Sequence, residues 1–178
     1  MNHHEFAERN GITLAAIFAG QKEEKHNAMG FTSMRYTYTI QLHKDGAHMT
    51  TEYHVGSGIL EHWAKEVDFR PQVEGGRMNF HQYSTNRNSR TKAGVQYLEA
   101  AAKAYQPKPG DLLCCLQMDA QSFDDAGGDF GAWADEWAVD LKPSEAWRTF
   151  QNLSKSVGDL RRFLGARLYA DLMECTED

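Results

Sequence analysis

The most constraining feature of the sequence is a long amphipathic segment near its C-terminal end. Large apolar residues recur there every three or four positions: Trp147, Phe150, Leu153, Val157, Leu160 and Leu164. This spacing places all of them on one stripe of an α-helix. Pro143 suits the first turn of such a helix, and Gly165 suits the left-handed residue that ends one. We therefore predict a helix over residues 142–165 whose apolar stripe is buried against the rest of the domain.

A second strong pattern predicts a β-hairpin over residues 34–55. The dipeptide Asp45-Gly46 is typical of a two-residue type I′ turn, and alternating runs flank it. Such a turn places Leu42 opposite Met49. The remaining residues of that face are mostly apolar or aromatic: Tyr36, Tyr38, Ile40, Thr51, Tyr53 and Val55. The other face carries polar residues and histidines. Because a shift by one residue would bury the polar face, we expect this register and a core under the tyrosine-rich face.

Shorter patterns predict the remaining elements. Helices are expected over residues 3–10, 59–67, 91–105 and 112–120, and over two short stretches between residues 119 and 140. A strand is expected over residues 13–19, with a continuation of the first helix as the alternative, and a charged, solvated loop over residues 20–30. Thr91 and Asp111 are expected to cap the helices that follow them. Residues 68–90 show no regular pattern.

These elements together predict an α+β fold. We expect a single domain over residues 1–178 with a small antiparallel sheet of about three strands. The sheet would pack under the C-terminal helices. Residues 59–109 would form a partly helical insertion within this domain.

Composition limits the classes of function. The formal net charge is −6 and the isoelectric point is about 5.7, which argues against a nucleic-acid binder that uses its whole surface. The cysteine count of 3 is odd, which favours a reducing compartment. No apolar run is long enough for a membrane helix. We expect a protein of the cytoplasm that has no membrane contact.

The segment over residues 119–140 is strongly acidic and contains no lysine or arginine. Six of its acids are candidate partner-binding residues: Asp124, Asp125, Asp129, Asp135, Glu136 and Asp140. They would form a negative surface that docks on the basic, nucleic-acid-binding surface of a partner protein. The alternative is a solvated helix face whose acids favour helix N-termini.

A basic segment offers an alternative function. Its arginines and lysine are interleaved with aromatic residues, a pattern that suits contact with single-stranded nucleic acid. The candidate residues are Arg70, Arg77, Phe80, Tyr83, Arg87, Arg90 and Lys92. The segment is equally compatible with a loop that its aromatic residues anchor to the domain. Its charge contrast with residues 119–140 also allows a homodimer.

The sequence contains no clear catalytic motif. Cys114 and Cys115 lie in an apolar helical run, where cysteines usually serve packing. His43, His48 and His54 share one sheet face, which leaves a metal-dependent hydrolase as a second alternative, but a third ligand is not evident. We therefore expect no catalytic residues, no metal and no cofactor.

Four segments carry a resemblance to a known group of proteins. They are residues 36–58, 111–116 (DLLCCL), 119–123 (DAQSF) and 160–165 (LRRFLG). In these segments the chain resembles a family of small, uncharacterised phage and prophage accessory proteins. The resemblance implies a non-catalytic phage protein in the host bacterial cytoplasm. By analogy with anti-CRISPR proteins, it implies binding to and inhibition of a bacterial defence complex of the CRISPR–Cas type.

Overall fold

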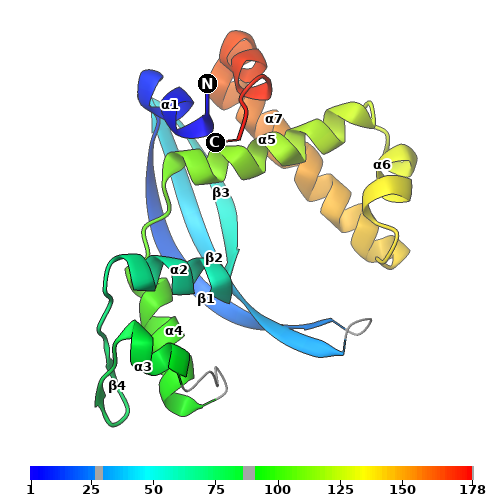
Figure 1. Cartoon of the computed structure of the whole chain (residues 1–178). Helices are drawn as coiled ribbons and strands as arrows, with labels where there is room; N and C mark the ends of the chain where they lie inside the picture. Colours follow the sequence, from blue (N-terminus) through cyan, green and yellow to red (C-terminus); the bar gives the residue numbers. More distant parts are fainter. Residues whose placement is uncertain (27–29, 86–90, 178) are drawn as a thin grey trace. The chain divides into compact units, whose positions relative to one another are not determined.

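The computed structural model describes residues 1–26, 30–85 and 91–177. The helices in these residues are α1 (His3–Arg9), α2 (Ser57–Glu66), α3 (Phe80–Thr85), α4 (Lys92–Ala104), α5 (Pro109–Asp125), α6 (Phe130–Trp137) and α7 (Pro143–Met173). The strands are β1 (Thr13–His26), β2 (Phe31–Lys44), β3 (Ala47–Gly56), β4 (Gln72–Val73) and β5 (Gly76–Arg77). One antiparallel sheet has the order β1-β2-β3, and β4 pairs with β5 separately (Figure 1). This arrangement confirms the predicted α+β fold with a three-stranded sheet.

The chain forms two compact units, each built from segments that are distant in sequence. Unit 1 comprises residues 1–15, 41–51 and 107–178, and unit 2 comprises residues 16–40 and 52–106. Most of the insertion predicted over residues 59–109 therefore belongs to unit 2. The single domain predicted for the whole chain stays a prediction.

The central hairpin follows the predicted pattern. Asp45 and Gly46 both have positive φ, 45° and 81°, as a type I′ turn requires. The predicted core face is buried at Tyr36, Tyr38, Ile40, Leu42, Met49, Tyr53 and Val55. On the opposite face, Thr37 Oγ1 lies 3.0 Å from His54 Nδ1, which agrees with the register that the turn imposes. The hairpin and its buried face are therefore confirmed.

Two predictions for the flanking segments are wrong. Residues 20–26 are not a loop, because β1 continues to His26. The charged side chains of Lys22, Glu23 and Lys25 are exposed there, and the strand is defined by backbone pairing, which side-chain polarity does not reveal. Residues 80–85 form α3 instead of irregular structure. Residues 27–29 of the predicted loop and residues 86–90 lie outside the described residues.

The core of unit 2 is rich in aromatic contacts. The ring of Tyr97 stacks on that of Tyr83 with centroids 4.7 Å apart, and its hydroxyl donates to the Phe69 carbonyl at 3.1 Å. Trp63 packs on Phe69 and on Tyr105, with ring centroids 5.1 and 5.9 Å apart. These contacts hold α2, α3 and α4 together. The cap predicted for Thr91 is confirmed, since its Oγ1 accepts from the Gly94 N–H.

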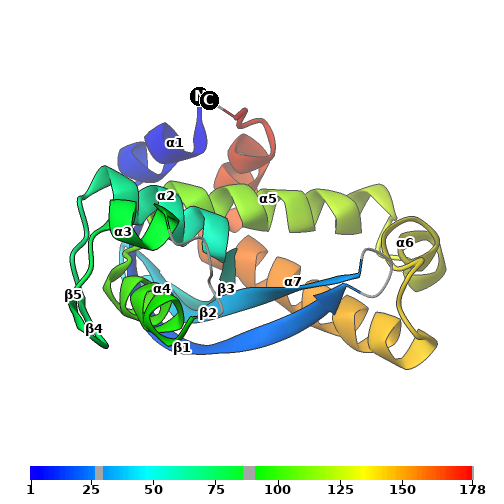
Figure 2. The ribbon, with the colours of Figure 1, turned by 60° about the horizontal axis from the view of Figure 1, so that its bottom comes forward.

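Unit 1 is built around α5. In this unit α1 and α7 pack on α5, and α6 packs on α7 (Figure 2). The C-terminal helices pack on the part of the sheet that belongs to their unit, where Leu42 and Met49 are buried. α5 begins at Pro109, so the prediction that Asp111 caps a helix from residue 112 is wrong. The helix starts earlier because proline is favourable in a first turn. Asp111 lies inside this first turn, and its carboxylate accepts from the N–H of the capping residue Lys108 at 3.2 Å.

The C-terminal helix follows its prediction in part. α7 extends to Met173, but Gly165 interrupts it with φ 74° and ψ 165°, which confirms the positive φ predicted for this residue. The expected burial of Trp147 is wrong, because this side chain is 48% exposed. Ala146 occupies the buried position in the first turn, and the rings of Phe130 and Phe150 lie against the Trp147 ring. The stripe is buried further along, at Phe150, Val157, Leu160 and Leu164.

Candidate functional site

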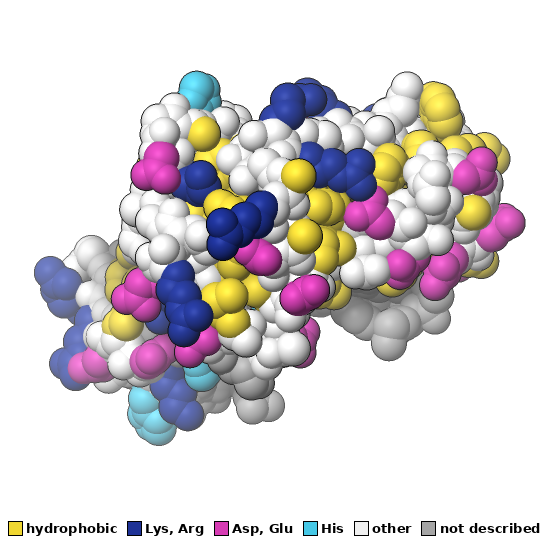
Figure 3. Space-filling view, turned by 90° about the horizontal axis from the view of Figure 1, so that it is seen from above, with side chains coloured by type: hydrophobic (Ala, Val, Ile, Leu, Met, Phe, Trp, Pro, Cys, Tyr) yellow, Lys and Arg dark blue, Asp and Glu magenta, His cyan; other side chains and the backbone are white. Residues whose placement is uncertain are grey.

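An exposed apolar surface of unit 1 lies around α6. Its apolar members are Trp137, Val139, Leu141 and Trp147, which are between 40% and 75% exposed. Its acidic members are Asp135, Glu136 and Asp140. We call these seven residues the aromatic–acidic patch. Figure 3 shows hydrophobic side chains gathered over this end of unit 1, with acidic side chains along their border.

The local sequence explains why these residues face solvent. Asp129 caps α6, since its Oδ1 accepts from the Ala132 N–H at 2.8 Å. Trp133 turns inward and packs on Phe150 with ring centroids 5.6 Å apart. Trp137 lies one turn later at the end of the helix, where no further helical residue covers it. The short connection from α6 to α7 then carries Val139 and Leu141.

Trp147 is half-exposed but firmly held. The Phe130 ring meets it edge-on with centroids 4.9 Å apart, and the Phe150 ring stacks on it at 6.1 Å. Aromatic contacts of this kind fix the orientation of a ring. The patch therefore presents an indole with two aromatic neighbours, and an indole that is already oriented loses less conformational entropy when a partner covers it.

The three acids of the patch carry uncompensated charge. Asp135, Glu136 and Asp140 are exposed, and none of them forms an ion pair with another described residue. No lysine or arginine occurs in the sequence between Lys108 and Lys142. The apolar centre thus has a negative border.

The other three predicted partner-binding acids have structural partners. Asp124 accepts from the Arg161 guanidinium and from the Tyr169 hydroxyl, the latter at 2.7 Å. Burial and this hydrogen bond raise the pKa of Tyr169. Asp125 accepts from the Gln121 amide at 2.7 Å, and Asp129 caps α6. The structure therefore divides the predicted set into three acids with internal hydrogen bonds and three without an ion pair to a described residue.

Several of the candidate nucleic-acid-binding residues are engaged within unit 2. Tyr83 is buried and donates its hydroxyl to Glu61 at 2.7 Å. Burial and Glu61 raise its pKa well above the usual range. In this position the Tyr83 ring stacks on Tyr97 and not on a base. Phe80 is half-buried and packs against Tyr83 with ring centroids 6.0 Å apart.

The cationic candidates that the structure describes have partners within unit 2. Arg70 is paired with Asp68, and Lys92 is paired with Glu74, at 2.6 and 3.3 Å. Arg77 is exposed and donates to the Arg70 carbonyl at 3.0 Å. Arg87 and Arg90 lie outside the described residues.

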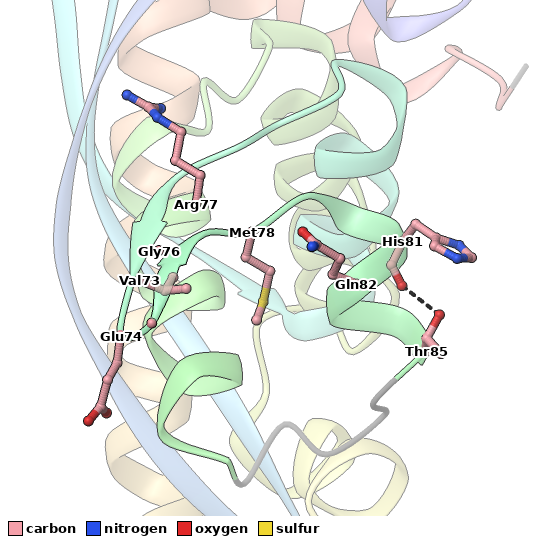
Figure 4. A pocket seen from close by; sticks show the side chains of 9 residues that line it. Val73, Glu74, Gly76, Arg77, Met78, His81, Gln82 and Thr85 are labelled. Carbon is pink, nitrogen blue, oxygen red and sulfur yellow. Dashed lines mark hydrogen bonds between the residues drawn. The ribbon is translucent and has the colours of Figure 1, made fainter.

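Arg77 lines an open pocket of about 360 Å³ between the β4–β5 hairpin and α3. In Figure 4, Arg77 and Glu74 extend away from each other, and Met78 lies between the hairpin and the helix. The backbone carbonyl of His81 accepts a hydrogen bond from the Thr85 hydroxyl at 2.7 Å. This lining offers no pair of groups arranged for acid–base or nucleophilic chemistry.

The other groups with potential for chemistry lie apart. His43, His48 and His54 are exposed on the polar sheet face. Within residues 1–26, 30–85 and 91–177, no group of three or more potential ligands could hold a metal ion. Burial, with Glu177 and Asp111, raises the pKa of the Cys114 thiol, so it is protonated near neutral pH.

None of the known protein families, curated proteins or solved structures compared with this chain matches it. The resemblance to phage accessory proteins therefore stays a hypothesis. No helix in the described part of the chain combines the length and apolar character that a bilayer-spanning segment needs.

Sequence reasoning missed the apolar half of the patch. It assigned Trp147 to the core and gave Trp137, Val139 and Leu141 no role. One available signal was the mixture of acids and large apolar residues from Asp135 to Leu141, which does not fit a helix stripe.

Proposed function

We propose that this chain is a binding protein that docks on a basic surface of a partner protein through the aromatic–acidic patch. The observation that carries the proposal is the exposure of two tryptophans, in α6 and α7, within a segment where three carboxylates form no ion pair with a described residue. Tryptophans often dominate the binding energy of interfaces. A rim of one charge favours a partner of the opposite charge and speeds the encounter.

The resemblance suggests the class of partner. A phage accessory protein would act in the host bacterial cytoplasm, and a CRISPR–Cas defence complex carries basic surfaces that bind nucleic acid. Carboxylates of the patch would occupy positions that phosphates otherwise take. Binding there would inhibit the complex without any catalysis by this chain.

The test is direct binding of the purified chain to purified host effector complexes. We expect Trp137→Ala and Trp147→Ala each to weaken binding about 30-fold, as for interface residues that contribute about 2 kcal/mol. Asp135→Asn, Glu136→Gln and Asp140→Asn should slow association and reduce the effect of salt. Ile59→Ala and Val67→Ala are matched controls, because both residues are exposed and apolar but lie in unit 2.

Loss of binding in the controls but not in the tryptophan variants would refute the proposal, as would the absence of any complex at low salt. A second assay follows nucleic-acid cleavage by the effector complex. Inhibition should disappear with the same two tryptophan variants.

The alternative function, nucleic-acid binding by the basic segment, can be tested separately. If the basic segment binds nucleic acid, gel shifts with single- and double-stranded DNA and RNA should detect a complex at low salt. Arg77→Ala should weaken that complex, whereas Trp137→Ala should not.

A further inference from the structure

Part of one edge of the central sheet lacks the usual protection against further pairing. β1 is an outer strand of the order β1-β2-β3, so it has a single neighbour (Figures 1 and 2). No backbone hydrogen bond outside the strand ladder involves its residues in the described part of the chain. Alternate N–H and C=O groups of β1 are therefore available to another strand.

The sequence of this edge is uncharged over nine residues. The run Thr13 to Gln21 contains no charge and no proline, which are the usual guards of an edge strand. The other outer strand, β3, carries Glu52 and two histidines on its exposed face. Ile17 is 70% exposed at the middle of the uncharged run. Residues 13–21 of β1, which precede its charged residues Lys22, Glu23, Glu24 and Lys25, are thus the unguarded part of this edge.

We propose that β1 pairs antiparallel with β1 of a second copy of this chain, with the two-fold axis at Ile17. This pairing places Ile17 opposite itself and Ala15 opposite Ala19 on the exposed face. On the other face it places Ala16 opposite Phe18, and Leu14 opposite Gly20.

The sizes of the β1 side chains favour a second copy of this chain as the pairing partner. Each large residue on the half-buried face, Leu14 or Phe18, meets a small one, and the exposed Ile17 pair is flanked by alanines. A two-fold antiparallel pairing requires such self-complementarity, because the same surface serves both partners. The charged residues that begin at Lys22 fall beyond the paired run. The two sheets would join into one continuous sheet of six strands through β1.

Sedimentation velocity of the full chain over a range of concentrations tests this pairing. We expect a dimer, and Ile17→Lys should raise its dissociation constant at least about tenfold because two lysines would face each other at the axis. Ala19→Lys is a second variant, and circular dichroism establishes that both remain folded. Val67→Lys and Trp137→Ala are controls that should leave the dimer unchanged. Amides of residues 13–21 should exchange more slowly as the concentration rises.

The dimer should also persist at about 0.5 M salt, because its contacts are uncharged. An assembly driven by the contrast between the basic and acidic segments would instead dissociate. A chain that stays monomeric at all concentrations, a dimer that Ile17→Lys and Ala19→Lys leave intact, or dissociation in salt would each overturn the proposal.

Discussion

Individual buried side chains in this protein carry polar groups that need a partner. The Tyr38 side chain is almost completely buried, and its hydroxyl donates to the Ala102 carbonyl at 2.6 Å. This bond links β2 to the end of α4 inside unit 2. Burial raises the pKa of Tyr38 well above the usual range, so the hydroxyl stays protonated and remains a donor.

Tyr38→Phe should destabilise the protein by about 1–3 kcal/mol, because the buried Ala102 carbonyl then lacks its donor. Chemical denaturation measures the change. Tyr36→Phe is the matched control, since the Tyr36 hydroxyl makes no hydrogen bond with a described residue. An equal effect of the two substitutions would contradict the role given to the hydrogen bond.

His54 makes the stability of the protein depend on pH. Burial, and then the nearby Arg35 charge, lower its pKa below 6.5, although Glu52 and Glu24 oppose this shift. Near pH 6 the unfolded chain therefore binds more protons at this residue than the folded chain does. Its contribution to stability is present above about pH 6.5 and is lost as the pH falls through the folded-state pKa.

We expect the unfolding free energy to fall between about pH 7 and pH 5 by less in His54→Gln than in the natural sequence. Denaturation at several pH values in that window measures the difference. Parallel curves for the two proteins would show that His54 does not contribute.

At the scale of elements, helix ends decide where exposed residues lie. α6 has 8 residues, and its start depends on the Asp129 cap. A helix this short has little stability of its own. The position of Trp137 at its far end therefore depends on the cap and on the Trp133 anchor.

Asp129→Ala should cost about 1 kcal/mol of stability, while Asp129→Ser should cost much less, because serine can still accept from the Ala132 N–H. Thermal unfolding followed by circular dichroism compares the two. If the serine variant loses as much stability as the alanine variant, the charge and not the cap holds the helix.

At the scale of the molecule, the two units are joined by every strand of the central sheet. β1, β2 and β3 each contribute residues to both units. Because each strand continues from one unit into the other, we expect loss of strand structure in one unit to weaken the strands of the other.

We expect one denaturation midpoint for both units. Trp63 is in unit 2, whereas the other three tryptophans, Trp133, Trp137 and Trp147, are in unit 1. Fluorescence of Trp63→Phe therefore reports on unit 1 alone, and far-ultraviolet circular dichroism reports on the helices of both. Separate midpoints from the two probes would show that the units unfold independently.

Local signals in the sequence were sufficient to predict several elements. The Asp45-Gly46 turn and the alternation around it specify the hairpin, because two residues with positive φ impose one register. The Thr91 cap marks the start of α4 in the same way. Of the candidate site, the acids Asp135, Glu136 and Asp140 were predicted from composition alone.

The sequence by itself determined which residues form strands, turns and helix ends in the strongly patterned regions, since these depend on neighbours along the chain. Only the tertiary structure decided that β1 continues through a charged segment, that Asp124 is bonded to Arg161, and that Trp147 faces solvent. Strand pairing, ion pairing and burial each depend on groups brought together from distant positions. The spacing of Trp147 within its helix is the same whether or not another element covers it.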